Sequence, residues 1–243
     1  MVEDAGDYGI DLEWCYKVNI TGNFTRRCRP AGIAMFIRTT QCTITGNTVN
    51  LRGMPRGIWL NAYSHHNTVS GNSCTGLPVG VLPSPDREKQ EISGVRFVDA
   101  GIGIDVWMSS HNTITGNLVD GVAIGIYLGG SERNVITGNR VTAQREGLYL
   151  HRAQQNLVTS NSLEIADVEG EQGRVIVLDV NMRRPGEDLD WNTWGVGKEG
   201  YPSANNIIRD NILAGGDQFI VDHAKEAALI AVFTLHILPR RCR

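Results

Sequence analysis

Aromatic, acidic and histidine side chains recur in this chain at two fixed positions, two and four residues after a repeated glycine. The members of this set that could bind or react with a ligand are Trp59, Asn61, Asp105, Trp107, Tyr127, Tyr149 and His151. Aromatic faces stack on the C–H faces of sugar rings, and amides and carboxylates hydrogen-bond to sugar hydroxyls. This combination of residue types favours a row of side chains that holds a carbohydrate chain. The alternative is that these rings have high β-propensity and are covered by other segments of the chain.

Reaction at a uronate sugar needs a positive group at the carboxylate, a base for the C5 proton, and an acid at the leaving side or the opposite face. The predicted catalytic residues are therefore Arg56, Asp105 and His151. In this hypothesis Arg56 neutralises the sugar carboxylate, His151 or Tyr127 moves the proton, and Asp105 orients it. The predicted substrate-binding residues are Trp59, Asn61, Trp107, Tyr127 and Tyr149. No pair of carboxylates stands at the spacing of a glycosidase.

Positive charge is concentrated near the start of the chain. No acidic residue lies between Glu13 and Asp86, and the basic residues in that interval are Lys17, Arg26, Arg27, Arg29, Arg38, Arg52 and Arg56. The guanidinium group of arginine makes bidentate hydrogen bonds with carboxylate or sulfate groups. We therefore predict a positive wall beside the first repeats and an acidic polysaccharide as the partner, against the alternative of solvated turns.

An internal repeat in the sequence predicts the strands and turns that position these residues. Thr-Gly-Asn or a close relative recurs every 22 to 25 residues, for example at Thr45-Gly46-Asn47 and Thr115-Gly116-Asn117, and Gly-Ile or a relative recurs in phase. Each repeat has the alternation of apolar residues that is typical of short strands. Coils of this length bury an apolar face only when they are stacked. The prediction is an all-β, right-handed parallel β-helix of about eight or nine coils with three strands per coil.

Two asparagine columns are expected to run along this stack. The first contains Asn23, Asn47, Asn72, Asn117, Asn139 and Asn161, and the second contains Asn67, Asn112, Asn134, Asn156 and Asn206. Buried amides need partners, and the neighbouring rungs can supply them. Cys42 and Cys74 fall at core positions and are expected to be buried.

The recurring Gly-Ile and Thr-Gly-Asn positions, from about Gly9 to Asn211, resemble the right-handed parallel β-helix repeats of the pectin-lyase-like superfamily. That superfamily includes polysaccharide lyases, glycoside hydrolases, uronate epimerases, phage tailspikes and a copper-site maturation protein. The resemblance implies a secreted or periplasmic protein that binds an acidic polysaccharide. Whether it is an enzyme of the lyase or epimerase type or a non-catalytic module or fragment stays open. Tyr8-Gly9-Ile10-Asp11 is similar to the opening of a Tyr-Gly-Phe-Asp-Pro-His-Asp stretch in bacterial alginate epimerases, and Leu12 and Glu13 depart from it.

The predicted parallel β-helix occupies residues 1–218, with a loop insertion at about 181–204, and a C-terminal tail or cap follows at 219–243. A fourth coil is expected between Pro78 and Val95, bulged by its prolines. The first coil begins almost at Met1 without room for a capping helix, which predicts that the chain is a fragment.

Composition limits the other classes of function. The chain has 243 residues and a net charge of −3, which argues against a nucleic-acid partner. It has no run of eighteen apolar residues, so no membrane insertion is expected. The five cysteines include no C-x-x-C pair, and His65-His66 is expected to be a turn pair, so we predict neither a metal site nor a cofactor. The sequence does not indicate an oligomeric state.

Overall fold

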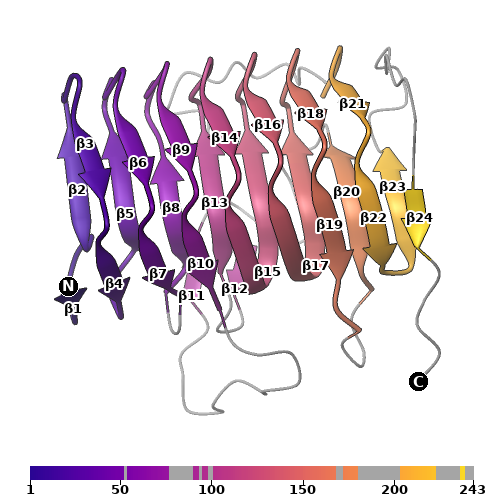
Figure 1. Cartoon of the computed structure of the whole chain (residues 1–243), viewed down its shortest axis with the longest axis horizontal. Helices are drawn as coiled ribbons and strands as arrows, with labels where there is room; N and C mark the ends of the chain where they lie inside the picture. The colour runs from indigo at the N-terminus through magenta and orange to yellow at the C-terminus, as the bar shows by residue number, and fades with distance from the viewer. Residues whose placement is uncertain are drawn as a thin grey trace.

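The computed structural model describes residues 1–51, 54–76, 90–92, 95–97, 101–167, 172–179, 203–222 and 236–238. Most of their strands are stacked in parallel along one axis and form a 15-stranded sheet, which covers two sides of the solenoid, and a 7-stranded sheet on the third side (Figure 1). This arrangement confirms the predicted all-β parallel β-helix, and the two sides of the larger sheet are called the first and second sheets below. Among the described residues, one side of the solenoid has eight rungs and another has seven, close to the eight or nine coils expected. Within the described residues, no helix is long and apolar enough to span a membrane.

Three groups of strands make up the three sides of the solenoid. The first sheet contains β2 (Ile10–Glu13), β5 (Ala31–Phe36), β8 (Arg56–Leu60), β13 (Ile102–Trp107), the second halves of β15 (Leu118–Gly129) and β17 (Arg140–His151), β20 (Arg174–Asp179) and β23 (Gln218–Asp222). The second sheet contains β1 (Val2–Glu3), β4 (Phe24–Arg26), β7 (Thr48–Asn50), β10 (Ser73–Thr75), the first halves of β15 and β17, β19 (Ser162–Ile165), β22 (Ile212–Gly215) and β24 (His236–Leu238). The third sheet contains β3 (Asn19–Thr21), β6 (Thr43–Thr45), β9 (Thr68–Ser70), β14 (Thr113–Thr115), β16 (Val135–Thr137), β18 (Leu157–Thr159) and β21 (Ile207–Arg209).

The expected fourth coil is wrong. β8 pairs directly with β13, β9 with β14, and β10 with β15, so no further rung lies between these strands in the stack. Between β10 and β13 in the sequence, β11 (Gln90–Ile92) and β12 (Val95–Phe97) form an antiparallel pair. The spacing of the repeat marks across this segment equals one coil, but the strands on either side of it pair with each other directly, so equal spacing in the sequence did not mean an added rung. Consequently Trp59 and Asp105 stand on adjacent rungs.

The interval between Asn161 and Asn211 also holds only one coil, because β18 pairs directly with β21. Within this interval, residues Arg174–Asp179 form β20, which pairs in parallel with β17. Most of the loop expected at 181–204 lies outside the described residues. The segment expected to be a tail contributes two strands: β23 pairs in parallel with β20, and β24 pairs in parallel with β22.

Both predicted asparagine columns are confirmed. In the first column, the side-chain oxygen of Asn117 accepts bonds of 3.0 Å from the backbone and side-chain nitrogens of Asn72, and Asn139 does the same for Asn117 at 3.0 and 2.9 Å. The second column repeats this pattern, as between Asn134 and Asn156. Each of these amides is buried and satisfied by the neighbouring rungs, which fixes the turn in every coil.

The solenoid core is filled by the residues one and three positions after the repeated glycine, for example Ile104 and Val106 on β13. The glycine itself is required by close packing: a Cβ on Gly103 would lie 2.2 Å from Cγ1 of Val119 and 2.7 Å from the oxygen of Gly125. Cys42 and Cys74 are buried in the same core, as expected. The alternation therefore directs the intervening side chains outward from the first sheet.

Candidate functional site

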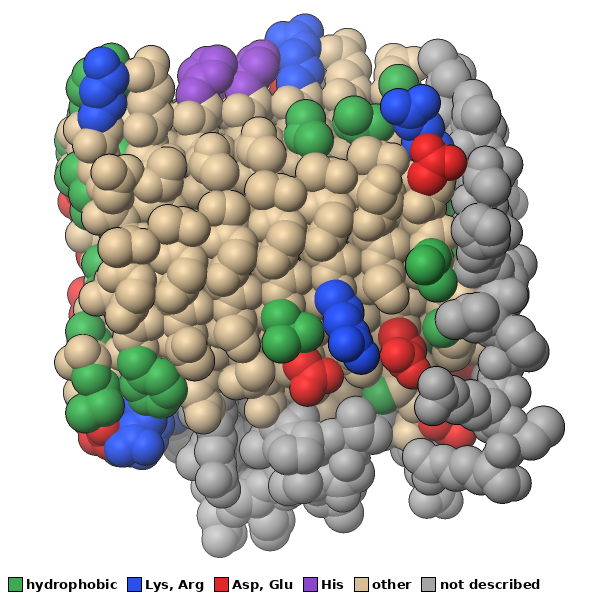
Figure 2. All heavy atoms as spheres, in the orientation of Figure 1, with side chains coloured by type: hydrophobic (Ala, Val, Ile, Leu, Met, Phe, Trp, Pro, Cys, Tyr) green, Lys and Arg blue, Asp and Glu red, His purple; other side chains and the backbone are tan. Residues whose placement is uncertain are grey.

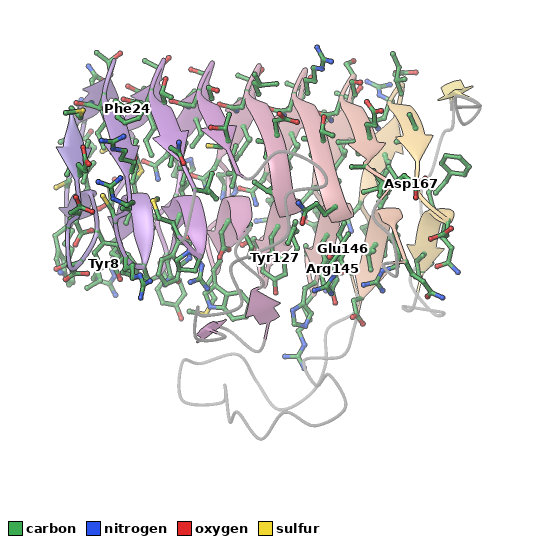
Figure 3. All side chains as sticks on the ribbon, turned by 90° about the horizontal axis from the view of Figure 1, so that it is seen from below. Tyr8, Phe24, Tyr127, Arg145, Glu146 and Asp167 are labelled. Atoms are coloured by element: carbon green, nitrogen blue, oxygen red, sulfur yellow. The ribbon has the colours of Figure 1, made fainter. Side chains whose placement is uncertain are left out.

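The outward side chains of the first sheet form a surface that we call the outer face. Figure 3 shows Tyr8, Tyr127, Arg145 and Glu146 along this side of the solenoid. In the strand register, Trp59, Asp105, Tyr127 and Tyr149 occupy successive rungs in one column. The sequence predicted the shared column, with a further coil between Trp59 and Asp105 that the pairing of β8 with β13 removes. The predicted site residues therefore come from four neighbouring strands, β8, β13, β15 and β17.

Arg56 and Asp105 form a buried ion pair on this face. The Nε of Arg56 donates to Oδ2 of Asp105 at 2.6 Å, and the two side chains are 1% and 3% exposed. The guanidinium carbon of Arg56 lies 3.9 Å from the ring centroid of Trp59, in a cation–π contact. Burial raises the pKa of the Asp105 carboxyl, against the opposite effect of Arg56. The two charges compensate each other. The sequence hypothesis assigned Arg56 to neutralise a sugar carboxylate, whereas in the structure its guanidinium group is paired with Asp105.

A second polar group lies on β15, β17 and β20. The Oη of Tyr127 and Nδ1 of His151 are 2.7 Å apart and share a hydrogen bond, and the hydroxyl of Tyr149 donates to Oδ2 of Asp179 at 2.6 Å. The ring of Trp107 stacks on Tyr127 with a centroid distance of 6.1 Å. A phenol hydrogen-bonded to an imidazole can pass a proton in either direction, so this pair is the part of the outer face that is suited to acid–base chemistry.

Glu146 is a buried carboxylate that the sequence reasoning missed. Its side chain is 1% exposed, and its Oε1 contacts the guanidinium groups of Arg145 and Arg174. Its Oε2 has no hydrogen-bond partner among the described residues, and the same is true of Oδ1 of Asp105. Glu146 directly precedes a repeated glycine, as Arg56 does, and that column also faces outward. The sequence feature that could have identified Glu146 is therefore its position directly before a repeated glycine, the position that Arg56 also occupies.

The outer face is less exposed than the sequence hypothesis required. Tyr127 and Tyr149 are 7% and 6% exposed, and they form a hydrophobic cluster with Ile102, Ile124 and Val177 that is separate from the solenoid core. Trp59 and Trp107 are half-buried. The expectation of an open row of aromatic rings is wrong, because the rings pack against one another across the rungs.

Asn61 and the histidine pair take structural positions. The side chain of Asn61 is half-buried, and its Oδ1 accepts a bond of 2.7 Å from the backbone nitrogen of Ala62, which stabilises the turn after β8. His65 and His66 lie in the same turn, as predicted. Within the described residues, no group of three or more His, Cys, Asp or Glu side chains could hold a metal ion.

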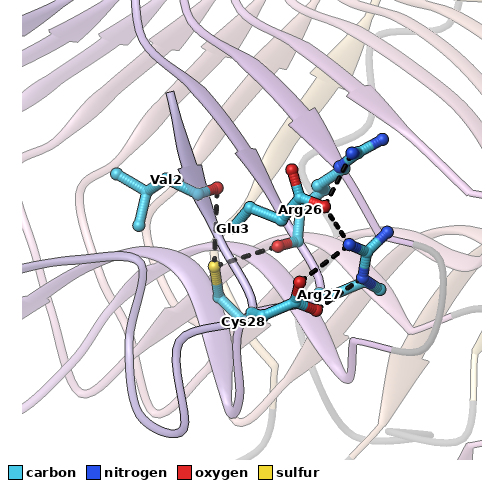
Figure 4. Close-up of polar contacts among 6 residues, drawn as sticks. Val2, Glu3, Arg26, Arg27 and Cys28 are labelled. Atoms are coloured by element: carbon cyan, nitrogen blue, oxygen red, sulfur yellow. Dashed lines mark hydrogen bonds and ion pairs between the residues drawn. The ribbon is translucent and has the colours of Figure 1, made fainter.

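The predicted positive wall is wrong for three of its arginines. Arg26 and Arg27 both bind Glu3, and Nε of Arg27 also donates to Oδ1 of Asp4 at 2.6 Å (Figure 4). Arg56 binds Asp105 on the outer face, away from that cluster. No acidic residue is near Arg26 and Arg27 in the sequence, but the stacking of β1 on β4 brings Glu3 and Asp4 onto these arginines. Arg29 is exposed, and Arg52 lies outside the described residues.

The first rung of the outer face carries negative charge instead. Burial, and then Asp11 and Asp7, raise the pKa of Tyr8 to about 12. Burial and Glu13 also raise the pKa of Asp11. The ring of Tyr8 packs 5.0 Å from that of Phe36, which lies 4.7 Å from that of Trp59.

Comparison with known proteins shows the fold. Residues 50–170, just under half of the chain, match the family described as "Periplasmic copper-binding protein (NosD)". Two crystal structures of substituted forms of the periplasmic alginate epimerase AlgG are similar to the chain, with TM-scores of 0.69 and 0.68 at 15% and 16% identity. These matches cover 95% and 96% of this chain and 48% of each epimerase chain, so the chain spans about half the length of those proteins. No curated protein sequence matches it.

Proposed function

We propose that this protein binds an acidic polysaccharide along the outer face of its first sheet and changes its uronate residues by C5 epimerisation or β-elimination. The observation that carries the proposal is the hydrogen bond of 2.7 Å between Tyr127 and His151, placed beside the ring of Trp107. The similarity to a periplasmic alginate epimerase supports this class of polymer and a location in the periplasm or outside the cell.

In both reactions a base first takes the proton from C5 of the uronate. In epimerisation, an acid then returns a proton to C5 from the opposite face. In elimination, the bond from C4 to the glycosidic oxygen breaks and the leaving oxygen takes a proton. His151 and Tyr127 supply the base and the acid in this proposal. Arg56 and Asp105 act together as a positioning pair under Trp59, since each holds the other in place.

The test is to incubate the protein with alginate, pectate and a neutral glucan. Unsaturated-uronate absorbance reports elimination, and deuterium exchange at C5, followed by NMR, reports epimerisation. We expect one of these signals on a uronate polymer only, with a loss of about a hundredfold or more in His151→Gln and Tyr127→Phe. Thr137→Val, which removes a hydroxyl from the third sheet, is the matched control. Unchanged rates in both site variants would place the chemistry elsewhere.

A specific observation favours a second candidate, a carbohydrate-binding or structural module without catalysis. Tyr127, Tyr149 and Asp105 are all buried, and the charge of Arg56 is matched by Asp105. Absence of both signals together with measurable binding of a uronate polymer would favour this candidate.

A further inference from the structure

The turns that join the first sheet to the third form a continuous edge that the outer face does not include. We call it the turn edge, and it consists of residues 14–18, 37–42, 61–67, 108–112, 130–134 and 152–156. Its rungs are joined by backbone bonds, for example from Lys17 to Thr40 at 3.2 Å and from His66 to Ser110 at 3.3 Å. The edge is therefore one rigid ridge along the stack.

Large aromatic side chains are exposed on the first rungs of this edge. Trp14, Tyr16 and Tyr63 are 65%, 57% and 46% exposed, which is more than any apolar side chain on the sheets of the described residues. Trp14 and Tyr63 also have positive φ values of 55° and 68°, a backbone conformation that is unfavourable for bulky residues. The fold buries only part of each of these rings, and three exposed rings on the first rungs of one edge are of the kind that marks a contact with another molecule.

Each of these rings is accompanied by a basic side chain. The Nζ of Lys17 lies 4.8 Å from the ring centroid of Tyr16, the guanidinium carbon of Arg38 lies 5.6 Å from that of Trp14, and the ring of His65 lies 6.2 Å from that of Tyr63. Further along, His66 and His111 stack with a centroid distance of 4.9 Å. In Figure 2, histidine side chains lie among Lys and Arg side chains along the upper edge of the molecule.

The charge of the turn edge is opposite to that of the whole protein. Its residues include four that are basic, Lys17, Arg38, Arg133 and Arg152, and one that is acidic, Glu132, with Glu13 just before it at the end of β2. The chain as a whole has a net charge of −3. Exposed rings beside cations suit a polymer with both apolar ring faces and negative groups, because the rings stack on the sugar and the cations contact its carboxylates.

We propose that the turn edge is a second binding surface for the acidic polysaccharide, centred on Trp14, Arg38 and Tyr63. The proposal rests on the proposed function for the class of ligand and not for the site of reaction. A chain bound here reaches the outer face around the turn, so the edge holds the polymer while the outer face acts on it.

The experiment measures binding of an oligo-uronate of about six residues, prepared from alginate, by isothermal titration. We expect Trp14→Ala and Tyr63→Ala to weaken binding about fivefold or more, and Arg38→Glu about tenfold. Leu118→Ala and Arg140→Glu are matched controls, because both residues are exposed on the second sheet, and we expect them to leave binding unchanged. A neutral cello-oligosaccharide and an oligo-thymidylate of similar length serve as alternative ligands.

Dependence on pH separates this surface from the outer face. His65 lies beside the ring of Tyr63 and faces His66, His111 and Glu132, and its pKa is lowered from 6.5 by burial and by the two neighbouring histidines. Protonation of His65 below that value adds a positive charge beside Tyr63 while uronate carboxylates stay ionised, so binding is expected to tighten as the pH falls below about 6.5, and to do so less in His65→Gln.

Unchanged affinity in Trp14→Ala and Arg38→Glu, with folding verified by circular dichroism, would overturn the turn-edge proposal. Tighter binding of oligo-thymidylate than of oligo-uronate would overturn the choice of ligand. Turnover that is lost in His151→Gln while edge binding persists supports both proposals. Binding that depends on the turn edge in a protein without turnover would support the edge and contradict the proposed catalysis.

Discussion

The asparagine columns and the outer face treat buried polar groups in opposite ways. In the columns, the amide oxygen and nitrogen of a residue such as Asn117 both have partners on the neighbouring rungs, Asn72 on one side and Asn139 on the other. On the outer face, the carboxylates of Asp105 and Glu146 are equally buried, yet each has one oxygen without a partner among the described residues. A repeated and satisfied polar group stabilises a fold, whereas an incompletely satisfied one costs free energy and points to a role beyond stability.

The largest effect is expected from breaking the buried ion pair. Arg56→Ala leaves the carboxylate of Asp105 buried without its counter-charge, so we expect a loss of about 3–5 kcal/mol in the free energy of unfolding, measured with urea. The double variant Arg56→Leu/Asp105→Leu removes both charges and is expected to lose much less. If the double variant lost as much as the single one, packing and not charge would explain the effect.

Removal of one asparagine from the column is expected to have the next largest effect. Asn117→Ala removes the acceptor of two bonds from Asn72 and one of the two bonds that the side-chain oxygen of Asn139 accepts, which predicts a loss of about 1–3 kcal/mol in the same measurement. Asn19→Ala is the matched control, since Asn19 is exposed on the third sheet. A similar loss at Asn19 would contradict the special role of the column.

The Tyr127–His151 contact is expected to be worth less to stability than to activity. A double-mutant cycle with Tyr127→Phe and His151→Gln should give a coupling of about 0.5–1.5 kcal/mol in unfolding free energy, as for one hydrogen bond. A coupling near zero would mean that the bond of 2.7 Å does not persist in solution.

The smallest effect is expected on the turn edge. Burial, and then the nearby His111 and His66, lower the pKa of His65 below its ordinary value of 6.5. The unfolded chain then binds more protons than the folded one as the pH falls below 6.5, so acidification reduces stability in that range. His65→Gln should show a smaller change in melting temperature between about pH 7 and pH 5. An unchanged pH profile in this variant would contradict the assignment.

Much of the fold was determined by the sequence alone. The spacing of the glycine and asparagine marks predicted the sheets, both amide columns and the inward and outward alternation, because a solenoid repeats one local geometry and each rung contacts only its neighbours. The same regularity placed Trp59, Asp105, Tyr127 and Tyr149 correctly in one column. The spacing of the marks was misleading between β10 and β13, where it predicted an additional coil, because the strands on either side pair with each other directly.

Only the tertiary structure decided which outward residues meet. The loss of one rung placed Asp105 next to Trp59 and Arg56, and the stacking of β1 on β4 neutralised Arg26 and Arg27 with Glu3 and Asp4. Side-chain exposure was also decided there, because Tyr127 and Tyr149 point away from the core and are nevertheless buried. The physical reason is that a repeat fixes the direction of each side chain, whereas its charge state and its exposure depend on neighbours that are distant in the sequence.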